Sequence, residues 1–174
     1  MKKTIFTLNV LFLTAISVVA QTSNDRQSLQ GLKGVRLTVR FVRADAIEKS
    51  QRAGILKMMK DEAKAKLENA GIVLFETADQ METTGRPHLI VNITLDKPNG
   101  STPAILMQTE LYQKVVLWRE SSIEMDVVTW KTYGTGGPTI ENWQLKTLLM
   151  SEMDDFIETY RTANSKSASL RRKE

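Results

Sequence analysis

The chain of 174 residues contains no cysteine, which excludes a disulfide-stapled fold, thiolate metal ligands and a cysteine nucleophile. It contains a single histidine, His88, so a metal site built on two histidines is excluded as well. With no cysteine, any metal would need oxygen ligands, and we expect no cofactor. His88 follows Pro87 at the start of a predicted strand, where we expect a partly exposed structural side chain.

A strong excess of basic charge is also missing from the part of the chain that is expected to fold. The formal net charge is +4, but two lysines lie within residues 1–20 and four basic residues lie within 165–174. The basic and acidic side chains between these two segments nearly balance, so no basic face of the kind that nucleic acid requires is expected. We predict a disordered basic tail over 165–174, with a weak electrostatic contact to anionic lipid or lipopolysaccharide as the alternative.

The first 20 residues have the layout of a secretory signal peptide. Lys2 and Lys3 precede a mostly apolar run from Ile5 to Val19, and Ala20 is a small residue of the kind required before cleavage. The alternative, a membrane anchor, needs roughly 20 apolar residues, and the run of about 15 is shorter. The sequence therefore predicts cleavage after Ala20 and export to the periplasm or the exterior of a bacterium, with no membrane span left afterwards.

Strand and helix periodicities occupy residues 34–164, which we expect to form one domain after a linker over 21–33. Apolar residues alternate from Val35 to Phe41 and from His88 to Leu95, as in half-buried strands. Further strands are predicted over 72–76, 104–119 and 123–132, and helices are predicted from a capping box at Asp45 and Glu48 to Gly71 and over 139–162. The order β-α-β-β-β-β-α predicts an α+β two-layer sandwich, in which a mostly antiparallel five-stranded sheet carries two helices on one face.

Both predicted helices have an apolar stripe. The stripe of the last helix consists of Leu145, Leu149, Met153, Phe156 and Tyr160, and that of the first consists of Ile55, Met59, Ala63 and Leu67. Spacings of three and four residues keep each stripe on one side of its helix. We expect Phe156 to be buried between the two stripes and the sheet, with Asp154 and Glu158 in solvent.

Three glycines precede the last helix in the stretch TWKTYGTGGP, where a phosphate-binding loop would lie. A Walker loop needs Lys and then Ser or Thr after its last glycine, so that the ammonium reaches the phosphates and the hydroxyl reaches magnesium. Here Pro138 and Thr139 follow Gly137, and Pro138 has no N–H to donate. We therefore predict a tight turn with one of these two residues at the helix start, and keep an anion at the helix N-terminus as the alternative.

Several local motifs occur together in one order along the chain. They are AGIVLFE after the first helix, GRPHLIVNI opening a strand, TW near the end of the last strand, and a closing helix with Asp154, Phe156, Tyr160 and Asn164. With these motifs the chain resembles, over roughly residues 33–164, a loose group of small exported bacterial proteins of unknown function. The resemblance implies the same fold and export, and it implies no activity.

Carboxylates are the remaining candidates for catalysis or metal binding. Asp154 and Asp155 are adjacent on a helix and point about 100° apart, so they do not converge. Glu110 and Asp126 lie on neighbouring predicted strands and offer a pair for a carboxylate-dependent hydrolase, although nothing in the sequence selects them. We therefore expect a non-enzymatic protein.

One face of the predicted sheet is unusually apolar for a face exposed to water. A three-residue turn at 120–122 would place Tyr112 opposite Trp130, Lys114 opposite Val128, and Trp118 opposite Glu124. The whole predicted face consists of Arg36, Arg40, Ile90, Tyr112, Lys114, Val116, Trp118, Val128 and Trp130. Exposed patches of this kind often mark contact sites, although cross-strand pairs that only stabilise the sheet, or a linker folded over it, would give the same pattern.

The sequence therefore favours an exported, non-enzymatic module that binds a protein partner, or a second copy of itself, through this face. An envelope component that contacts lipid or glycan through Trp118 and Trp130 is the alternative, since tryptophan suits a boundary between water and an apolar phase. A carboxylate-dependent hydrolase is the third hypothesis.

Overall fold

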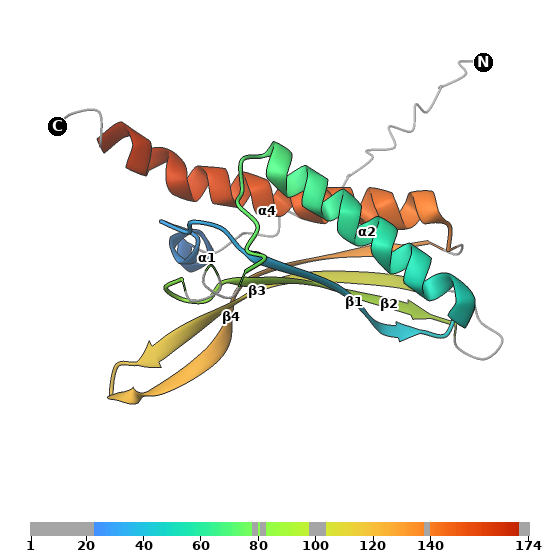
Figure 1. Cartoon of the computed structure of the whole chain (residues 1–174), viewed down its shortest axis with the longest axis horizontal. Helices are drawn as coiled ribbons and strands as arrows, with labels where there is room; N and C mark the ends of the chain where they lie inside the picture. Colours follow the sequence, from blue (N-terminus) through green and yellow to red (C-terminus); the bar gives the residue numbers. More distant parts are fainter. Residues whose placement is uncertain (1–22, 78–79, 81–82, 98–103, 138–139, 171–174) are drawn as a thin grey trace, which may run out of the picture.

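The computed structural model of the chain describes residues 23–77, 80, 83–97, 104–137 and 140–170. Within these residues four strands form one sheet, and the two long helices lie on one of its faces (Figure 1). The elements are α1 (Ser23–Ser28), β1 (Arg36–Ala44), α2 (Lys49–Asn69), β2 (His88–Asp96), β3 (Ala104–Leu117), β4 (Glu120–Gly136) and α4 (Asn142–Leu170). The predicted α+β class is confirmed.

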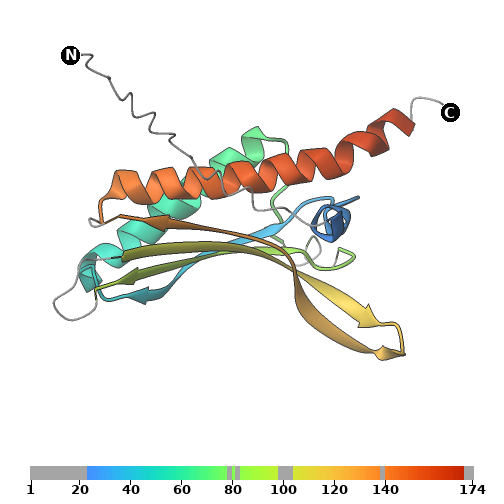
Figure 2. The same cartoon turned by 180° about the vertical axis from the view of Figure 1, so that it is seen from behind.

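The strands lie in the sheet in the order β1-β2-β3-β4. β1 and β2 are parallel, with α2 on the connection between them, whereas β2, β3 and β4 form an antiparallel meander. Parallel neighbours require such a crossover, which accounts for the α2 layer on one face. β3 and β4 continue past the end of β2 as a two-stranded arm, residues 113–127, which projects from the sheet (Figures 1 and 2).

The prediction of a fifth strand over 72–76 is wrong. This segment makes one parallel bridge, between Leu74 and Val35, with Val35 N donating to Val73 O at 2.9 Å and Phe75 N donating to Val35 O at 2.9 Å. The chain then leaves the sheet edge at Glu76, whose carboxylate pairs with Lys64 on α2 at 2.5 Å. Burial accounts for part of the apolar run, because Ile72 and Phe75 lie in the interior, whereas Val73 is exposed.

The core lies between the sheet and the two long helices. Leu145, Leu149 and Met153 of α4 and Met59, Ala63 and Leu67 of α2 are fully buried, so both predicted stripes face inward. Phe156 is also fully buried, and its ring meets the edge of Trp130 at a centroid distance of 5.1 Å. Asp154 and Glu158 are exposed, which confirms the predicted orientation of α4.

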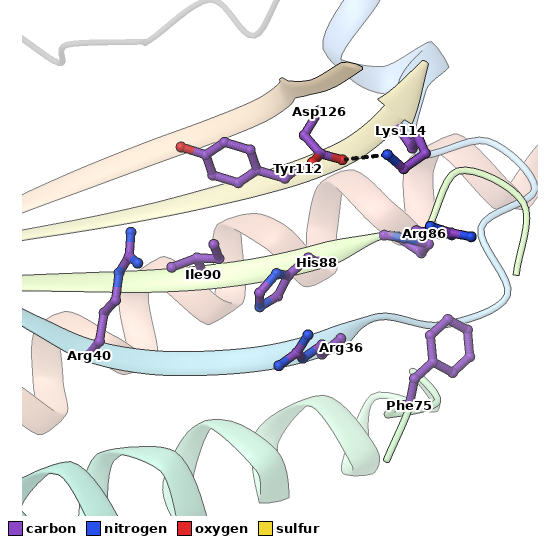
Figure 3. Close-up of a pocket in the computed structure, with 10 residues that line it drawn as sticks. Arg36, Arg40, Phe75, Arg86, His88, Ile90, Tyr112, Lys114 and Asp126 are labelled. Atoms are coloured by element: carbon purple, nitrogen blue, oxygen red, sulfur yellow. Dashed lines mark ion pairs between the residues drawn. The ribbon is translucent and has the colours of Figure 1, made fainter. Parts of the chain in front are cut away.

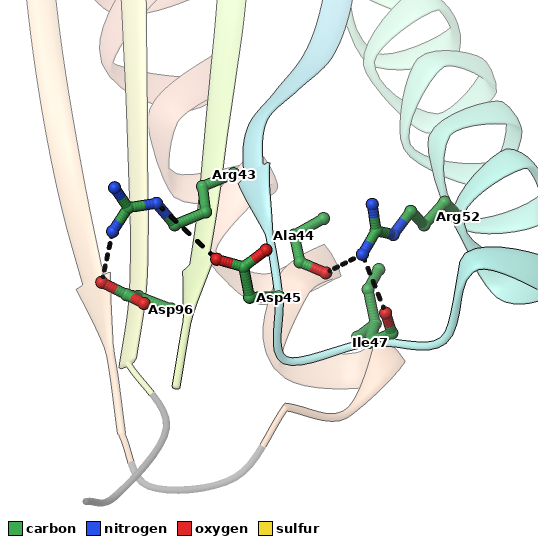
Figure 4. A network of polar contacts seen from close by, with 6 residues as sticks. All are labelled: Arg43, Ala44, Asp45, Ile47, Arg52 and Asp96. Carbon is green, nitrogen blue, oxygen red and sulfur yellow. Dashed lines mark hydrogen bonds and ion pairs between the residues drawn. The ribbon is translucent and has the colours of Figure 1, made fainter. Parts of the chain in front are cut away.

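The end of α2 is as predicted, but its start is not. Gly71 has φ +81, and its N–H and that of Ile72 donate to the carbonyls of Glu68 and Leu67, which is the Schellman arrangement. At the other end Glu48 is the N-cap residue and its side chain makes no capping bond, so the predicted capping box is wrong. Arg52 holds this corner instead, donating to the carbonyl oxygens of Ala44 at 2.6 Å and Ile47 at 3.3 Å (Figure 4).

The segment predicted to be a linker contains α1 and a buried residue, Leu29. It docks on the far part of α4. The Asn164 side chain accepts from Gly31 N at 2.8 Å and donates to Leu29 O at 3.0 Å, and the Tyr160 hydroxyl donates to Leu32 O at 3.0 Å.

Where a disordered tail is predicted, α4 continues as a helix through Leu170. Residues 171–174 and the predicted signal peptide over 1–20 lie outside the described residues. No helix in the described part of the chain is both long and apolar enough to cross a membrane.

The glycines of the GTGG stretch serve packing. β4 continues through Gly136, so two of the three glycines lie in a strand where a tight turn was predicted, and Pro138 and Thr139 lie outside the described residues. A Cβ atom at Gly134 would lie 3.0 Å from Glu152 Oε1, and one at Gly136 would lie 3.0 Å from Leu148 Cδ1. Both glycines therefore allow α4 to approach β4 closely.

Two other glycines give a matched test of the packing. A Cβ at Gly34 would lie 2.5 Å from Val73 O and 2.7 Å from the Phe75 ring, so Gly34→Ala should lower the free energy of unfolding by about 1–3 kcal/mol. A Cβ at Gly54, within α2, would meet nothing within 4 Å, so Gly54→Ala should raise it by about 0.5–1 kcal/mol. Urea denaturation of both variants measures the difference, and equal effects would contradict the close approach at Gly34.

Candidate functional site

The sheet face opposite the two long helices is open among the described residues (Figure 2). Side chains alternate across a strand, so residues 36, 38 and 40 of β1 point to this face while Leu37 and Val39 point to the core. The pairing register of β1, β2 and β3 places the outward-facing residues of these strands in rows that run across the sheet. Arg36 lies beside His88, which lies beside Tyr112.

A pocket of about 540 Å³ opens on this face around the starts of β1 and β2, and it is lined by residues of all four strands and of the segments before β2 and after α2 (Figure 3). Its lining consists of Arg36, Arg40, Phe75, Arg86, Pro87, His88, Ile90, Tyr112, Lys114 and Asp126. Its volume is within the range of small-molecule sites. Five of the nine residues predicted for the face line it, namely Arg36, Arg40, Ile90, Tyr112 and Lys114.

Trp130 does not belong to this face, and its predicted place there is wrong. The structure pairs Leu111 with Trp130 and Tyr112 with Val128, so Thr129 is an extra residue in β4 and forms a bulge. The bulge turns Trp130 to the helix side of the sheet, where only 1% of its surface is exposed. Between the bulge and the turn the predicted pairing is shifted by two residues for another reason, because the turn lies at residues 118–119, with Leu117 opposite Glu120 and Val116 opposite Glu124.

Val116, Trp118 and Val128 lie outside the pocket. Trp118 is in the turn between β3 and β4, where it is fully exposed, and it does not face Glu124 as predicted. Val116 pairs with Glu124 on the arm, and Val128 pairs with Tyr112 at its base. Both valines are exposed and Trp118 is at the tip, so the arm carries apolar surface of its own.

A chain of hydrogen bonds fixes the polar side chains beside the pocket. The Glu110 carboxylate accepts from Tyr112 Oη at 3.1 Å, Asn92 Nδ2 at 3.1 Å and Gln108 Nε2 at 2.8 Å. The Asn92 oxygen in turn accepts from Arg40 Nε at 2.7 Å. Burial, together with the bond to Glu110, raises the pKa of the Tyr112 hydroxyl, so Tyr112 stays a neutral donor.

His88 lies in the middle of the pocket, and its Nε2 is 2.8 Å from the Thr38 hydroxyl (Figure 3). Burial lowers the pKa of His88 below its usual range, and the positive charges of Arg36 and Arg40 lower it further. Asp126 opposes this effect from the other side of the pocket. His88 is therefore neutral at pH 7. Its side chain is partly exposed, as predicted, and it lines the candidate site.

Both candidate carboxylates, Glu110 and Asp126, have polar partners in the structure. Glu110 is engaged by the three donors described above, and Asp126 lies 3.8 Å from the Lys114 ammonium. Glu152 has a raised pKa, but it is buried between α4 and β4, away from the pocket. Within the described residues, no three acidic or histidine side chains come together as a metal site would require.

Sequence reasoning missed half of the pocket lining. Arg86 and Pro87 precede β2, and Phe75 follows α2, so they reach the pocket only through the fold. Arg86 has φ 39, an uncommon backbone conformation for a side chain of this size, and no sequence pattern predicted it. Asp126 would have been found opposite Lys114 had the register at the turn between β3 and β4 been foreseen, where the structure pairs Leu117 with Glu120 and Val116 with Glu124.

No protein-family model and no curated protein sequence matches the chain. Among solved structures, the chain is similar to a PelC dodecamer from Paraburkholderia phytofirmans, with 15% identity, 74% of this chain and 90% of that chain covered, and a TM-score of 0.36. It is also similar to a minor lipoprotein from Acinetobacter baumannii, with 14% identity, 76% and 93% of the two chains covered, and a TM-score of 0.29. Similarities this distant assign no function to the chain.

Proposed function

We propose that the protein is an exported, non-enzymatic binding module that holds its ligand or partner on the open sheet face. The pocket lined by five of the predicted face residues carries this proposal. It combines a largely buried apolar residue, Ile90, with charged side chains around it, which is the usual composition of a binding site. Export rests on the predicted signal peptide.

The arrangement of polar groups also favours binding over catalysis. A hydrolase would need a carboxylate or histidine free to activate water, with a second group to protonate the leaving group. In the pocket, Asp126 is paired with a lysine and His88 with a threonine, and beside it Glu110 is held by three donors. These contacts hold side chains in place, as a preformed binding site requires.

The arm favours a second candidate function, contact with the lipid of an envelope. Trp118 at its tip is fully exposed, and Val116, Ile123 and Met125 are exposed beside it. Trp130 is in the core, so the two-tryptophan anchor predicted from the sequence is reduced to Trp118. Self-association through the same apolar surface would appear as a dimer in sedimentation.

The proposed function is tested by mapping binding on the protein with ¹⁵N chemical shifts. Titration with a panel of neutral and acidic oligosaccharides, extended peptides and lipid vesicles should give saturable shifts at Ile90 and Tyr112. Tyr112→Ser should abolish them, whereas Tyr133→Ser, an exposed tyrosine outside the pocket, should not. Binding unchanged in Tyr112→Ser, or shifts confined to the helix side, would refute the proposal, and a vesicle-induced change at Trp118 alone would favour the arm.

A further inference from the structure

The charge of the pocket is strongly one-sided. Four cationic side chains line it, from Arg36, Arg40, Arg86 and Lys114, against one carboxylate, Asp126. That carboxylate sits near Lys114, with 3.8 Å between Nζ and Oδ1, so it offsets the lysine and leaves the arginines of β1 uncompensated. The electrostatic potentials of neighbouring positive charges add up, and apolar walls weaken the screening by water. The pocket therefore attracts anions.

The two arginines of β1 that line the pocket, Arg36 and Arg40, have no carboxylate partner among the described residues. The Arg36 side chain makes neither a hydrogen bond nor an ion pair there, and the Arg40 side chain makes one hydrogen bond, through Nε, to the neutral Asn92 amide. Arg43, on the same strand, is different, because it pairs with Asp96 at 2.9 Å and approaches Asp45 at 3.8 Å (Figure 4). The terminal nitrogens of Arg36 and Arg40 are therefore available to a ligand.

A network of hydrogen bonds holds the Arg40 side chain in position. Arg40 is oriented by Asn92, which is itself held by Glu110, and Glu110 is held by Tyr112 and Gln108. This network presents the guanidinium edge that carries the two terminal nitrogens. Guanidinium groups presented in this way bind carboxylate or phosphate oxygens through two parallel hydrogen bonds. Asn92 and Glu110 are positioning residues for Arg40.

The floor between the arginines is apolar and partly aromatic. Ile90 is largely buried, and the Tyr112 side chain lies on the neighbouring strand (Figure 3). Phe75 and Pro87 add further apolar surface to the lining. A bare inorganic anion would leave this surface uncovered. A ring or a short apolar body attached to the anion would cover it and add burial energy to the charged contacts.

We propose that this pocket binds an organic anion, with Arg36 and Arg40 holding its carboxylate or phosphate group and with its ring or apolar body lying over Ile90 and Tyr112. This inference rests on the proposed function and names the ligand class of the same site. His88 lies between the two arginines, so a bound anion contacts or approaches its ring. The negative charge of the bound anion stabilises the protonated form of the imidazole, which raises the pKa of His88.

The test uses His88 as a reporter, because it is the sole histidine of the chain and its ring resonances need no assignment. The protein, carrying no histidine tag, is titrated with phenyl phosphate, benzoate, benzamide and inorganic phosphate. Phenyl phosphate and benzoate should shift His88 and raise its pKa, and benzamide, which is uncharged and close in shape to benzoate, should do neither. Inorganic phosphate should bind more weakly than phenyl phosphate, because it has no ring for the floor.

Variants decide whether the arginines are responsible. Arg36→Ala with Arg40→Ala should weaken binding of phenyl phosphate at least about tenfold, while Lys49→Ala, which removes an exposed charge at the start of α2, should leave it unchanged. Both variants are expected to melt as the wild type does, since both sites are exposed.

Equal affinity in the double arginine variant, or equal binding of benzamide and benzoate, would overturn the anion site. In the second case the neutral ligand still occupies the pocket, so the proposed function stands without this inference. If neither these probes nor any member of the wider panel shifts the open face, both proposals fall together.

Discussion

Replacing Phe156 with alanine should lower the free energy of unfolding by about 3–5 kcal/mol. The side chain is fully buried between both helices and the sheet, and its ring packs edge to face against Trp130 at 5.1 Å and beside Tyr160 at 6.4 Å. The cavity left behind is lined by rigid neighbours from three elements, which cannot all move inward. A domain of this size has about 5–15 kcal/mol in total, so urea denaturation should show a much earlier midpoint or no cooperative transition.

Trp118→Ala is the matched control for Phe156→Ala, because it also removes an aromatic ring, but from a position that is fully exposed. Its free energy of unfolding should stay within about 0.5 kcal/mol of the wild-type value. If Phe156→Ala behaves like Trp118→Ala, α4 packs on the sheet by another face and the two-layer arrangement described above is wrong.

The second large effect should appear as a fall in stability between acidic and neutral pH. Glu152 exposes 2% of its surface, and its Oε2 has no hydrogen-bond partner among the described residues. Burial raises its pKa from 4.5 to about 7, with a smaller contribution from the charge of Asp155, while Thr109 opposes the shift. The folded protein therefore binds a proton more tightly at this position than the unfolded chain does.

The direction of the effect follows from that difference in proton affinity. Below pH 4.5 the carboxyl is protonated in both states, and its full contribution to stability is present. As the pH rises from 4.5 to about 7, unfolding releases the proton, so each step in pH favours the unfolded state, by about 3 kcal/mol over the whole interval. Above pH 7 the loss is complete.

Glu152→Gln should remove this pH dependence, because the amide stays neutral at every pH. Urea denaturation from pH 4.5 to 8 should give a flatter profile than the wild type, and the variant should be the more stable protein at pH 8. Glu158→Gln, an exposed position one turn and a half further along α4, should keep the wild-type profile. If the free energy of unfolding of Glu152→Gln falls with pH as steeply as that of the wild type, other titratable groups cause the pH dependence.

Helix faces and the outline of the sheet were predictable because they depend on local periodicity. The stripe ending at Phe156 and Tyr160 needed only a spacing of three and four residues, and the glycine at 71 needed only a positive φ. The strands of the meander were predictable from alternation. These features are decided within a few residues of the chain, where sequence carries most of its information.

Features that depend on distant pairing were not predictable. No particular residue type in the sequence marks the bulge at Thr129. One extra residue nevertheless moves Trp130 to the other face of the sheet, because side chains alternate with a period of two. The segment 72–76 looks like a strand, but only Leu74 finds a partner. The bulge therefore removes Trp130 from the predicted face, while Val128 stays on that face, opposite Tyr112.

The docking of the first described segment on the last helix has a consequence for how the molecule is made. Gly31 and Asn164 are joined by a hydrogen bond across 133 positions of sequence. A polypeptide leaves the ribosome, or crosses a membrane, with its N-terminus first, so Leu29 has no place to dock until residues near Tyr160 have emerged. A segment that is made before every strand of the sheet is thus among the last to reach its final place, because its binding surface on α4 is made after them.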